Sequence, residues 1–165
     1  MIQDTHKISV DSPELRALFQ QEILDHWLEL KGSAAMPSKR GFRPQKFPQS
    51  LGQLAIVSID DGGNFNDRLK GGLVNDVLKL SEGNQQLAAP FDTKIAATIK
   101  RILTESRDAA EPMYFTGRLH PPVRPPVDFS VLIVPFGEED DSTPTSLLLA
   151  FDFTKHAATK LFEAT

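Results

Sequence analysis

The stretch HWLELKGSAAMPSKRGFRPQKFPQSLGQLAIVSIDDGGNFNDRLKGG, residues 26–72, decides the fold. It contains two short runs that mix apolar and polar residues, 55–60 and 64–70, joined at Asp-Asp-Gly-Gly. Glycine adopts the positive φ angles that a tight hairpin turn requires, so these runs are predicted to form two antiparallel strands. Residues 33–54 contain three prolines, which prevent a continuous helix or a central strand there. The stretch therefore leads from a helix, through a loop, into the first hairpin of a sheet.

An amphipathic segment, residues 11–31, precedes the loop. Asp11 or Ser12 can cap a helix that ends at Gly32. Apolar residues recur at spacings of three and four along it: Leu15, Leu18, Phe19, Ile23 and Trp27. Such a stripe must be buried, so the helix is expected to pack against either the back of the sheet or a second copy of the chain. Residues 1–10 show no clear periodicity and are predicted to be a loosely held arm.

The rest of the chain switches from helical to strand patterns. Residues 73–80 fit a short helix and residues 92–107 a longer one, because apolar residues recur there every three to four positions. Period two then appears in three segments, followed by a terminal helix: 113–120, 127–136, 146–153 and 155–165. Hairpin-linked strands with helices inserted between them predict a single α+β domain over residues 1–165. Its antiparallel sheet and inserted helices occupy 54–154, with the helices on one face.

Composition limits the classes of function. The chain has no cysteine, so it forms neither disulfides nor thiolate metal sites, and a reducing, cytoplasmic location is expected. Its net charge of −4 argues against a nucleic-acid partner, and no apolar run is long enough for a membrane span. One loop is locally basic through Lys39, Arg40, Arg43 and Lys46. A solvated loop is the simpler interpretation of these charges, and an anion site is the alternative.

No motif in the sequence identifies an enzyme or a metal site. The four histidines lack metal-ligand spacing, and no serine lies in a Gly-x-Ser-x-Gly elbow. We therefore expect no metal, no cofactor and no catalytic residue. The strongest enzymatic alternative is a small α+β lyase or isomerase, in which Asp67 has a raised pKa among apolar neighbours and acts as a base near Tyr114. A surface Asp67 paired with Arg68 is the simpler interpretation.

Several short motifs carry a family resemblance. They are Trp27 at the helix end, the loop Met-Pro-Ser-Lys-Arg at 36–40, and Phe-x-x-Arg-Leu-x-Gly at 65–71. Farther along, Val-Pro-Phe at 134–136 resembles the end of the family's penultimate strand. Together with the order of elements, these residues resemble a bacterial family of small, largely stand-alone PAS-like domains. That family has an aromatic residue where this chain has Asp67.

The resemblance implies a five-stranded antiparallel sheet that cups several helices around a cavity, which in PAS domains can hold a small molecule. It implies a non-catalytic sensory or regulatory role with signalling through another protein, and a ligand-free interaction module is the alternative. The expected ligand contacts are Arg68, Tyr114, Asp67, Phe65, Phe115, Phe129 and Phe151. A flanking N-terminal helix often mediates dimerisation in PAS domains, which assigns a homodimer interface to Leu15, Phe19, Ile23 and Trp27.

Overall fold

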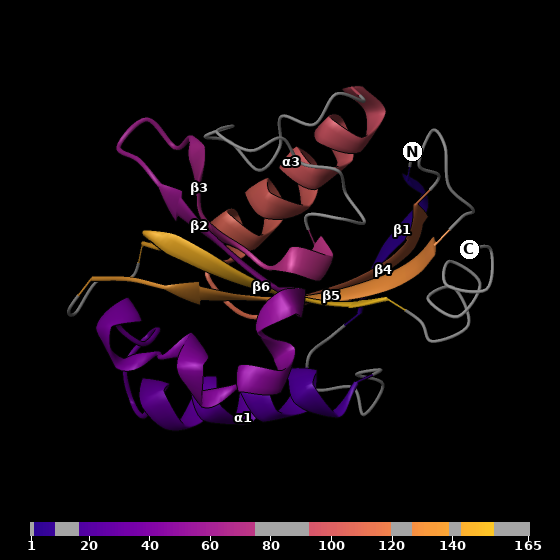
Figure 1. Ribbon diagram of the computed structural model, residues 1–165. Helices are drawn as coiled ribbons and strands as arrows, with labels where there is room; N and C mark the ends of the chain where they lie inside the picture. The colour runs from indigo at the N-terminus through magenta and orange to yellow at the C-terminus, as the bar shows by residue number, and fades with distance from the viewer. Residues whose placement is uncertain (1, 9–16, 75–92, 120–126, 139–142, 154–165) are drawn as a thin grey trace.

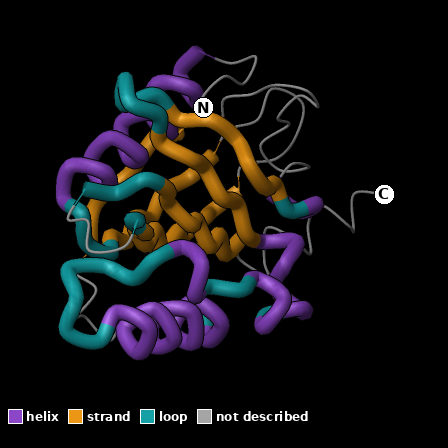
Figure 2. Tube along the Cα trace, turned by 90° about the vertical axis from the view of Figure 1, so that its left-hand side faces the viewer, coloured by secondary structure: helices purple, strands orange, loops and turns teal. Residues whose placement is uncertain are grey.

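The computed structural model of the chain describes residues 2–8, 17–74, 93–119, 127–138 and 143–153. Its described helices are α1 (Leu18–Lys31) and α3 (Thr93–Ala109). Its described strands are β1 (Ile2–Ile8), β2 (Leu54–Ile59), β3 (Phe65–Lys70), β4 (Met113–Leu119), β5 (Val127–Phe136) and β6 (Ser146–Phe153). The sheet forms a central layer with α3 on one side and α1 on the other, as Figure 1 shows and the turned view in Figure 2 also makes visible.

The described strands form one antiparallel sheet in the order β1-β4-β5-β6-β2-β3. Its five predicted strands, β2 to β6, are present together with helix α3, which confirms the predicted α+β fold. The sixth strand is a correction. The sequence predicts a loose arm at residues 1–10, whereas Ile2–Ile8 pairs with β4 at the edge of the sheet. An edge strand is stabilised by a partner distant in the sequence, so local periodicity does not reveal it.

The turn between β2 and β3 follows the chemistry that its sequence predicts. The Asp60 carboxylate accepts hydrogen bonds from the backbone N–H groups of Gly62 and Asn64, each at 2.9 Å. Gly63 has φ = 81°, a conformation that glycine adopts without strain. These contacts fix the geometry of the hairpin that forms one end of the sheet.

Helix α1 begins at Leu18 rather than near residue 11, because Ala17 has an extended backbone with φ = −118° and ψ = 140°. It ends at Gly32, as predicted, where φ is 53°. The helix covers the face of the sheet opposite α3, which is one of the two positions expected for its apolar stripe. Its buried side chains share an apolar cluster with the α1 side of the sheet: Ile23, Leu24, Trp27, Leu54, Tyr114, Leu132, Val134, Phe136, Leu148 and Ala150.

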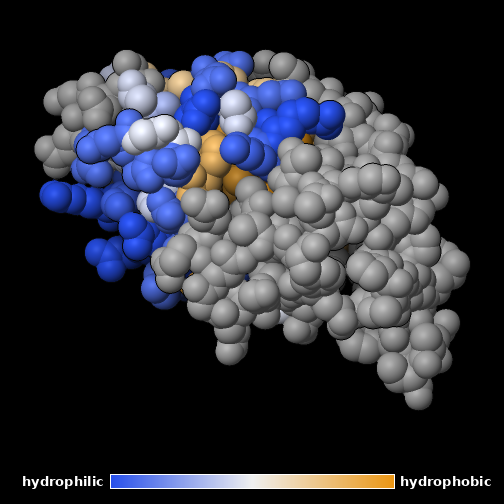
Figure 3. Space-filling view, turned by 90° about the horizontal axis from the view of Figure 1, so that it is seen from above, coloured by the Kyte–Doolittle hydropathy of each residue, from blue (hydrophilic) through white to orange (hydrophobic). Residues whose placement is uncertain are grey.

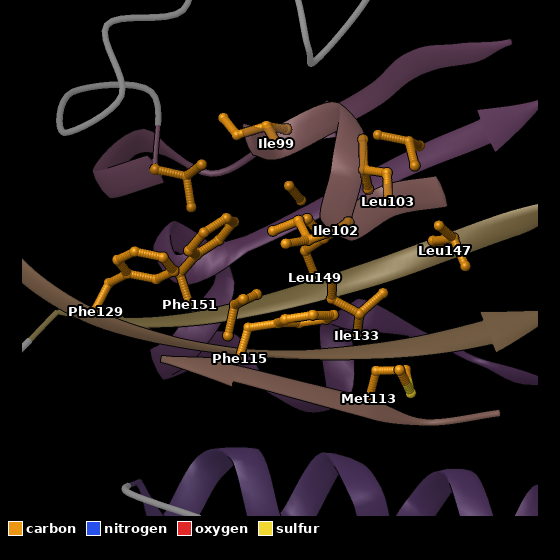
Figure 4. Close-up of a cluster of buried hydrophobic side chains, with 14 of the residues drawn as sticks. Ile99, Ile102, Leu103, Met113, Phe115, Phe129, Ile133, Leu147, Leu149 and Phe151 are labelled. Carbon is orange, nitrogen blue, oxygen red and sulfur yellow. The ribbon is translucent and has the colours of Figure 1, made fainter. Parts of the chain in front are cut away.

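Helix α3 covers the other face. Its buried side chains Ile99, Ile102 and Leu103 point toward the sheet, where they join a cluster of aromatic and aliphatic residues from β2 to β6. Figure 4 shows part of this cluster. In β2, β4, β5 and β6, residues of this cluster alternate along the strand with residues of the α1 cluster. The central strands are therefore buried on both faces, and the protein has two separate apolar layers.

The loop between α1 and β2 contains three short 3-10 helices: η1 (Lys39–Gly41), η2 (Pro44–Lys46) and η3 (Pro48–Gln53). Pro44 and Pro48 each begin one of them, where a missing N–H costs no hydrogen bond. Residues 72–74 are helical, but the rest of the helix predicted at 73–80 lies outside the described residues, as do Leu15 and the helix predicted at 155–165.

Candidate functional site

The four aromatic residues expected to contact a ligand lie together on the α3 face. Phe65, Phe115, Phe129 and Phe151 belong to the same apolar cluster, and each is at most 5% exposed. The rings of Phe129 and Phe151 lie 6.3 Å apart, and Phe151 stacks on Phe153 at 5.6 Å. These side chains belong to one apolar layer between the sheet and α3, which we call the aromatic wall, and a ring contact within it joins Phe129 to Phe151.

Asp67, which is also an expected ligand contact, is a polar residue on this face. It lies opposite Val57, a member of the α3 cluster, and directly opposed residues in an antiparallel pair point to the same side. Its side chain is only 7% exposed, and among the described residues its carboxylate makes no polar contact other than the one with Lys70. Lys70 lies 3.5 Å away on the same strand. Burial raises the pKa of Asp67, and the charge and hydrogen bonding of Lys70 oppose the shift.

Arg68 and Tyr114 do not join this site, which corrects the sequence-based expectation. The register between β2 and β3 shifts at Arg68, since Leu69 lies opposite Ile56 whereas Asp67 lies opposite Val57. Arg68 is the extra residue of this bulge, and its Nε donates to Ser58 Oγ at 3.0 Å on the α1 side of the hairpin. Tyr114 is fully buried in the α1 cluster.

The proposed catalytic pairing of Asp67 with Tyr114 is therefore wrong in this structure. The two side chains are on opposite faces of the sheet, because Asp67 aligns with the α3 cluster and Tyr114 belongs to the α1 cluster. A base on one face cannot act with a hydroxyl on the other.

A polar cavity lies between the β2–β3 hairpin and α3. It has a volume of about 440 Å³ and is lined by Gly62, Gly63, Asn64, Phe65, Lys100, Thr104 and Arg107. The Arg107 guanidinium lies 5.4 Å above the Phe65 ring and donates to the Gly63 carbonyl at 2.7 Å. These two contacts tie the hairpin to α3 and close one end of the aromatic wall.

The residues expected to form a dimer interface are mostly used within the chain. Ile23 and Trp27 are at most 2% exposed, and Phe19 packs against the same α1 cluster. Trp27 Nε1 also donates to the Pro135 carbonyl at 2.7 Å. The assignment of Ile23 and Trp27 to a dimer interface is therefore wrong, because the sheet already covers both side chains.

Gln20 also connects α1 to the sheet, and the sequence analysis did not predict this role. It is fully buried, and its Nε2 donates to the Ala150 carbonyl at 2.9 Å and to Ser130 Oγ at 3.2 Å. A signal was available, because Gln20, Ile23 and Trp27 follow one another at spacings of three and four. A polar residue on an apolar stripe indicates a buried hydrogen-bonding site.

His26 behaves as a packing residue. Its ring lies 5.6 Å from Phe42 and 5.8 Å from Phe47. Burial lowers its pKa, the charge of Lys46 lowers it further, and Glu29 acts in the opposite direction. The described part of the chain contains no cluster of three His, Asp or Glu residues suited to a metal ion. No described helix is long and apolar enough to cross a membrane.

Three of the motifs that carry the family resemblance meet at one end of the α1 face: Trp27, the loop at 36–40 and Val-Pro-Phe at 134–136. Besides the bond from Trp27 to Pro135, the Gly137 N–H donates to the Pro37 carbonyl at 3.0 Å. The Phe42 ring packs 5.2 Å from Phe136. Residues far apart in the sequence thus form one structural unit that joins the helix end, the loop and the sheet.

The motif at residues 65–71 ends in Gly71, and the structure shows why this position requires glycine. A Cβ at this position would collide with the backbone carbonyl oxygens of Leu51 and Gly52 in η3. The Gly71 N–H meanwhile donates to the Leu54 carbonyl at 2.7 Å. Only glycine allows this close approach between the loop and the end of β3.

A model of the PAS domain family matches residues 16–150, a region that includes α1, β2 to β5, α3 and most of β6. The chain belongs to the PAS domain family. This membership confirms the predicted PAS-like fold and suggests a sensory or regulatory role. Strand β1 lies before the matched region, so it is an addition to the part of this PAS domain that the family defines.

The crystal structure of a LOV protein from Rhodobacter sphaeroides is similar to this PAS domain at 12% sequence identity and a TM-score of 0.43, over 74% of each chain. The comparison with curated proteins found no match.

Proposed function

We propose that this PAS domain is a non-catalytic sensory or regulatory module that holds a small molecule against the α3 face of the sheet. The ligand would rest on the aromatic wall of Phe65, Phe115, Phe129 and Phe151 and meet Asp67 as its polar contact. Occupancy would be communicated through contacts with a signalling protein. The lack of cysteine supports a cytoplasmic site of action.

The buried carboxylate of Asp67 carries this proposal. A buried carboxylate with a single ion pair costs stability, and such groups persist in proteins where they serve a function. Asp67 lies two residues from Phe65 on the same face of β3 and 3.5 Å from Lys70, so apolar surface and both signs of charge occur close together. Apolar walls with a few polar groups are the usual composition of small-molecule sites.

The chemistry of these residues favours an amphipathic ligand with a hydrogen-bond donor. A carboxylate accepts hydrogen bonds, so a hydroxyl, amide or amine of the ligand would satisfy Asp67. The rest of the ligand would be apolar. On the α3 side, Figure 3 shows mostly hydrophilic described residues with hydrophobic residues visible between them.

Native mass spectrometry of the full chain after gentle purification tests this function. The wild type should carry a reproducible bound mass, and Asp67→Leu should lose it. Asp61→Leu is the matched control, because Asp61 is an exposed carboxylate in the hairpin turn and should leave the bound mass unchanged. A bare wild-type chain, together with a crystal structure whose α3 face is completely filled by side chains, would overturn the proposal.

The contacts between aromatic rings also favour a second candidate, a ligand-free interaction module. If Phe129, Phe151 and Phe153 fill the α3 face by themselves, no small molecule is needed to complete the core. The same experiment separates the two functions, since this module would be bare in its wild-type and variant forms.

We further propose that the domain forms a homodimer through the outer side of α1. Leu18 is 75% exposed and Leu28 is 51% exposed, so both remain available after α1 has packed against the sheet. The double variant Leu18→Glu with Leu28→Glu should sediment as a folded monomer, whereas Glu22→Ala with Glu29→Ala should keep the wild-type behaviour. A monomeric wild type, or a dimer that survives the leucine changes, would contradict the proposed interface.

A further inference from the structure

A separate cavity lies on the α1 face of the sheet, beneath the basic loop that contains Lys39 and Arg40. Its volume is about 250 Å³, and its walls are mainly apolar. The apolar lining residues come from the loop and from three strands: Phe42, Pro44, Ile56, Phe136 and Leu148. Lys39, Arg40 and Ser146 complete the lining. The sheet separates this cavity from the aromatic wall, because Ile56 and Leu148 face the α1 side and lie opposite each other in β2 and β6.

The loop that covers this cavity is held in place by the sheet. The Lys39 N–H donates to the Gly137 carbonyl at 3.4 Å, and Ser38 and Gly137 form a parallel bridge. Ser38 Oγ also accepts a hydrogen bond from the Arg40 N–H at 3.3 Å. The backbone next to both basic side chains is therefore positioned before any ligand arrives, which lowers the entropic cost of binding.

Charge is the second feature of the cavity. Lys39 and Arg40 are exposed at its rim, and Arg43 and Lys46 lie in the same loop. The chain as a whole has a net charge of −4, so this cluster of cations is a local exception. Among the described acidic residues, the exposed Glu138 is nearest in sequence to the bridge between Ser38 and Gly137. A solvated loop accounts for cations on a surface, but it does not account for an apolar cavity directly below them.

We propose that this cavity binds a small amphipathic anion, namely a short alkyl chain that ends in a carboxylate. The alkyl chain would enter between Phe42, Ile56 and Leu148, and the carboxylate would remain at the rim with Lys39 and Arg40. The cavity is smaller than the ~300–1,000 Å³ typical of sites for drug-sized ligands, so one unbranched chain fits it better than a ring system. This site goes beyond the ligand proposed for the α3 face and is independent of it.

Straight-chain carboxylates provide the test, with the full chain titrated with hexanoate and octanoate by calorimetry. Each additional buried CH2 should raise affinity about fourfold, so octanoate should bind about 15-fold more tightly than hexanoate. Octylamine has the same alkyl chain with a cationic end and should not bind detectably. High salt should weaken octanoate binding, because the rim charges are exposed to solvent.

Charge-reversal variants connect the binding to this loop. Lys39→Glu with Arg40→Glu should lower octanoate affinity at least about tenfold, since both exposed cations become repulsive. Arg43→Glu with Lys46→Glu is the matched control in the same loop, and its effect should be several times smaller because neither residue lines the cavity. All four side chains are exposed, so both variants are expected to fold.

Methyl NMR places the ligand on one face. With labelled Ile and Leu, octanoate should shift the signals of Ile56 and Leu148 and leave those of Ile102 and Leu103 unchanged. No saturable octanoate binding at concentrations of about 1 mM, equal binding of octylamine, or shifts confined to Ile102 and Leu103 would overturn the proposal. The function proposed for the α3 face is tested by a bound mass and by Asp67→Leu, so the two proposals can fail separately.

Discussion

The two faces of the sheet are covered by helices in different ways. On the α1 face, two buried polar side chains bind the strands directly: Gln20 Nε2 reaches the Ala150 carbonyl at 2.9 Å, and Trp27 Nε1 reaches the Pro135 carbonyl at 2.7 Å. On the α3 face, Ile99, Ile102 and Leu103 supply apolar contacts. A polar connection from α3 to the sheet lies near the C-terminal end of the helix, where Arg107 donates to the Gly63 carbonyl in the hairpin.

This difference indicates that α1 has a fixed position on the sheet, whereas α3 can repack. Hydrogen bonds are directional, so Gln20 and Trp27 fix the position of α1 along β5 and β6 as well as its distance from them. Apolar contacts are not directional, and a helix held by them can repack around a molecule of similar shape. Asp67, a buried carboxylate whose polar contact among the described residues is Lys70 alone, is on the α3 face. The small-molecule function proposed above therefore belongs to the α3 face, and the interface between α1 and the sheet has a structural role.

The largest expected effect comes from Trp27→Ala. Removing this buried ring should lower the free energy of unfolding by about 3–5 kcal/mol, because it creates a cavity and leaves the Pro135 carbonyl without its donor. Urea denaturation measures the change. Leu28→Ala is the control on the same helix, where the side chain is 51% exposed, and a change within about 0.5 kcal/mol is expected. A loss below about 1 kcal/mol for Trp27→Ala would show that α1 is not an integral layer of the fold.

The second effect isolates the hydrogen bonds from the apolar packing. Gln20→Met keeps the length of the side chain and removes its donor, so stability should fall by about 1–3 kcal/mol as the Ala150 carbonyl becomes unsatisfied. Gln21→Met is the neighbouring control, since the side chain of Gln21 donates to the exposed Asp25 on the surface of the same helix. If Gln20→Met were as stable as the wild type, the α1 face would be held like the α3 face, and the contrast between them would disappear.

The third effect has the opposite sign. Asp67→Leu should raise the free energy of unfolding by about 0.5–2 kcal/mol near neutral pH, because desolvation of the carboxylate outweighs its ion pair with Lys70, and the Lys70 side chain remains partly exposed to water. The same variant should lose the bound mass. A gain in stability together with a loss of ligand is the result expected for a binding residue and not for a structural ion pair.

The pH dependence of this variant follows from the raised pKa of Asp67. The folded chain holds this proton more tightly than the unfolded chain, so the contribution of Asp67 to stability is greatest at low pH and is lost as pH rises through the folded-state pKa. The advantage of Asp67→Leu over the wild type should therefore shrink as pH falls toward about 3.9, the pKa of an unfolded aspartate. Urea titrations across this range measure it, and an advantage that grew at low pH would contradict the raised pKa.

Much of this fold could be predicted because its signals are local. The hairpin turn depends on Asp60 and on the positive φ of Gly63, and α3 on a regular apolar spacing. Strand β1 could not be predicted, since its ladder depends on β4, more than a hundred residues later in the sequence. The late start of α1 was missed because apolar spacing continues through Leu15, upstream of the extended Ala17.

The site was predicted less well than the fold, for two physical reasons. In β4 both faces are covered, so Tyr114 and Phe115 are both buried and alternation does not indicate which of them faces α3. In β3 the bulge adds one residue and moves Arg68 to the side opposite Asp67. A shift of one residue reverses the face to which a side chain points, and no residue in the motif at 65–71 predicts the bulge.

The smallest expected effect tests that bulge. Arg68→Ala removes an exposed side chain whose Nε bonds Ser58, so stability should change by no more than about 0.5 kcal/mol. Because Arg68 is on the α1 side, the mass bound by the wild type should remain, although the adjacent change Asp67→Leu removes it. Native mass spectrometry of the two variants side by side makes the comparison. Loss of the bound mass in Arg68→Ala would mean that the ligand extends around the edge of β3, and the two faces would then not act separately.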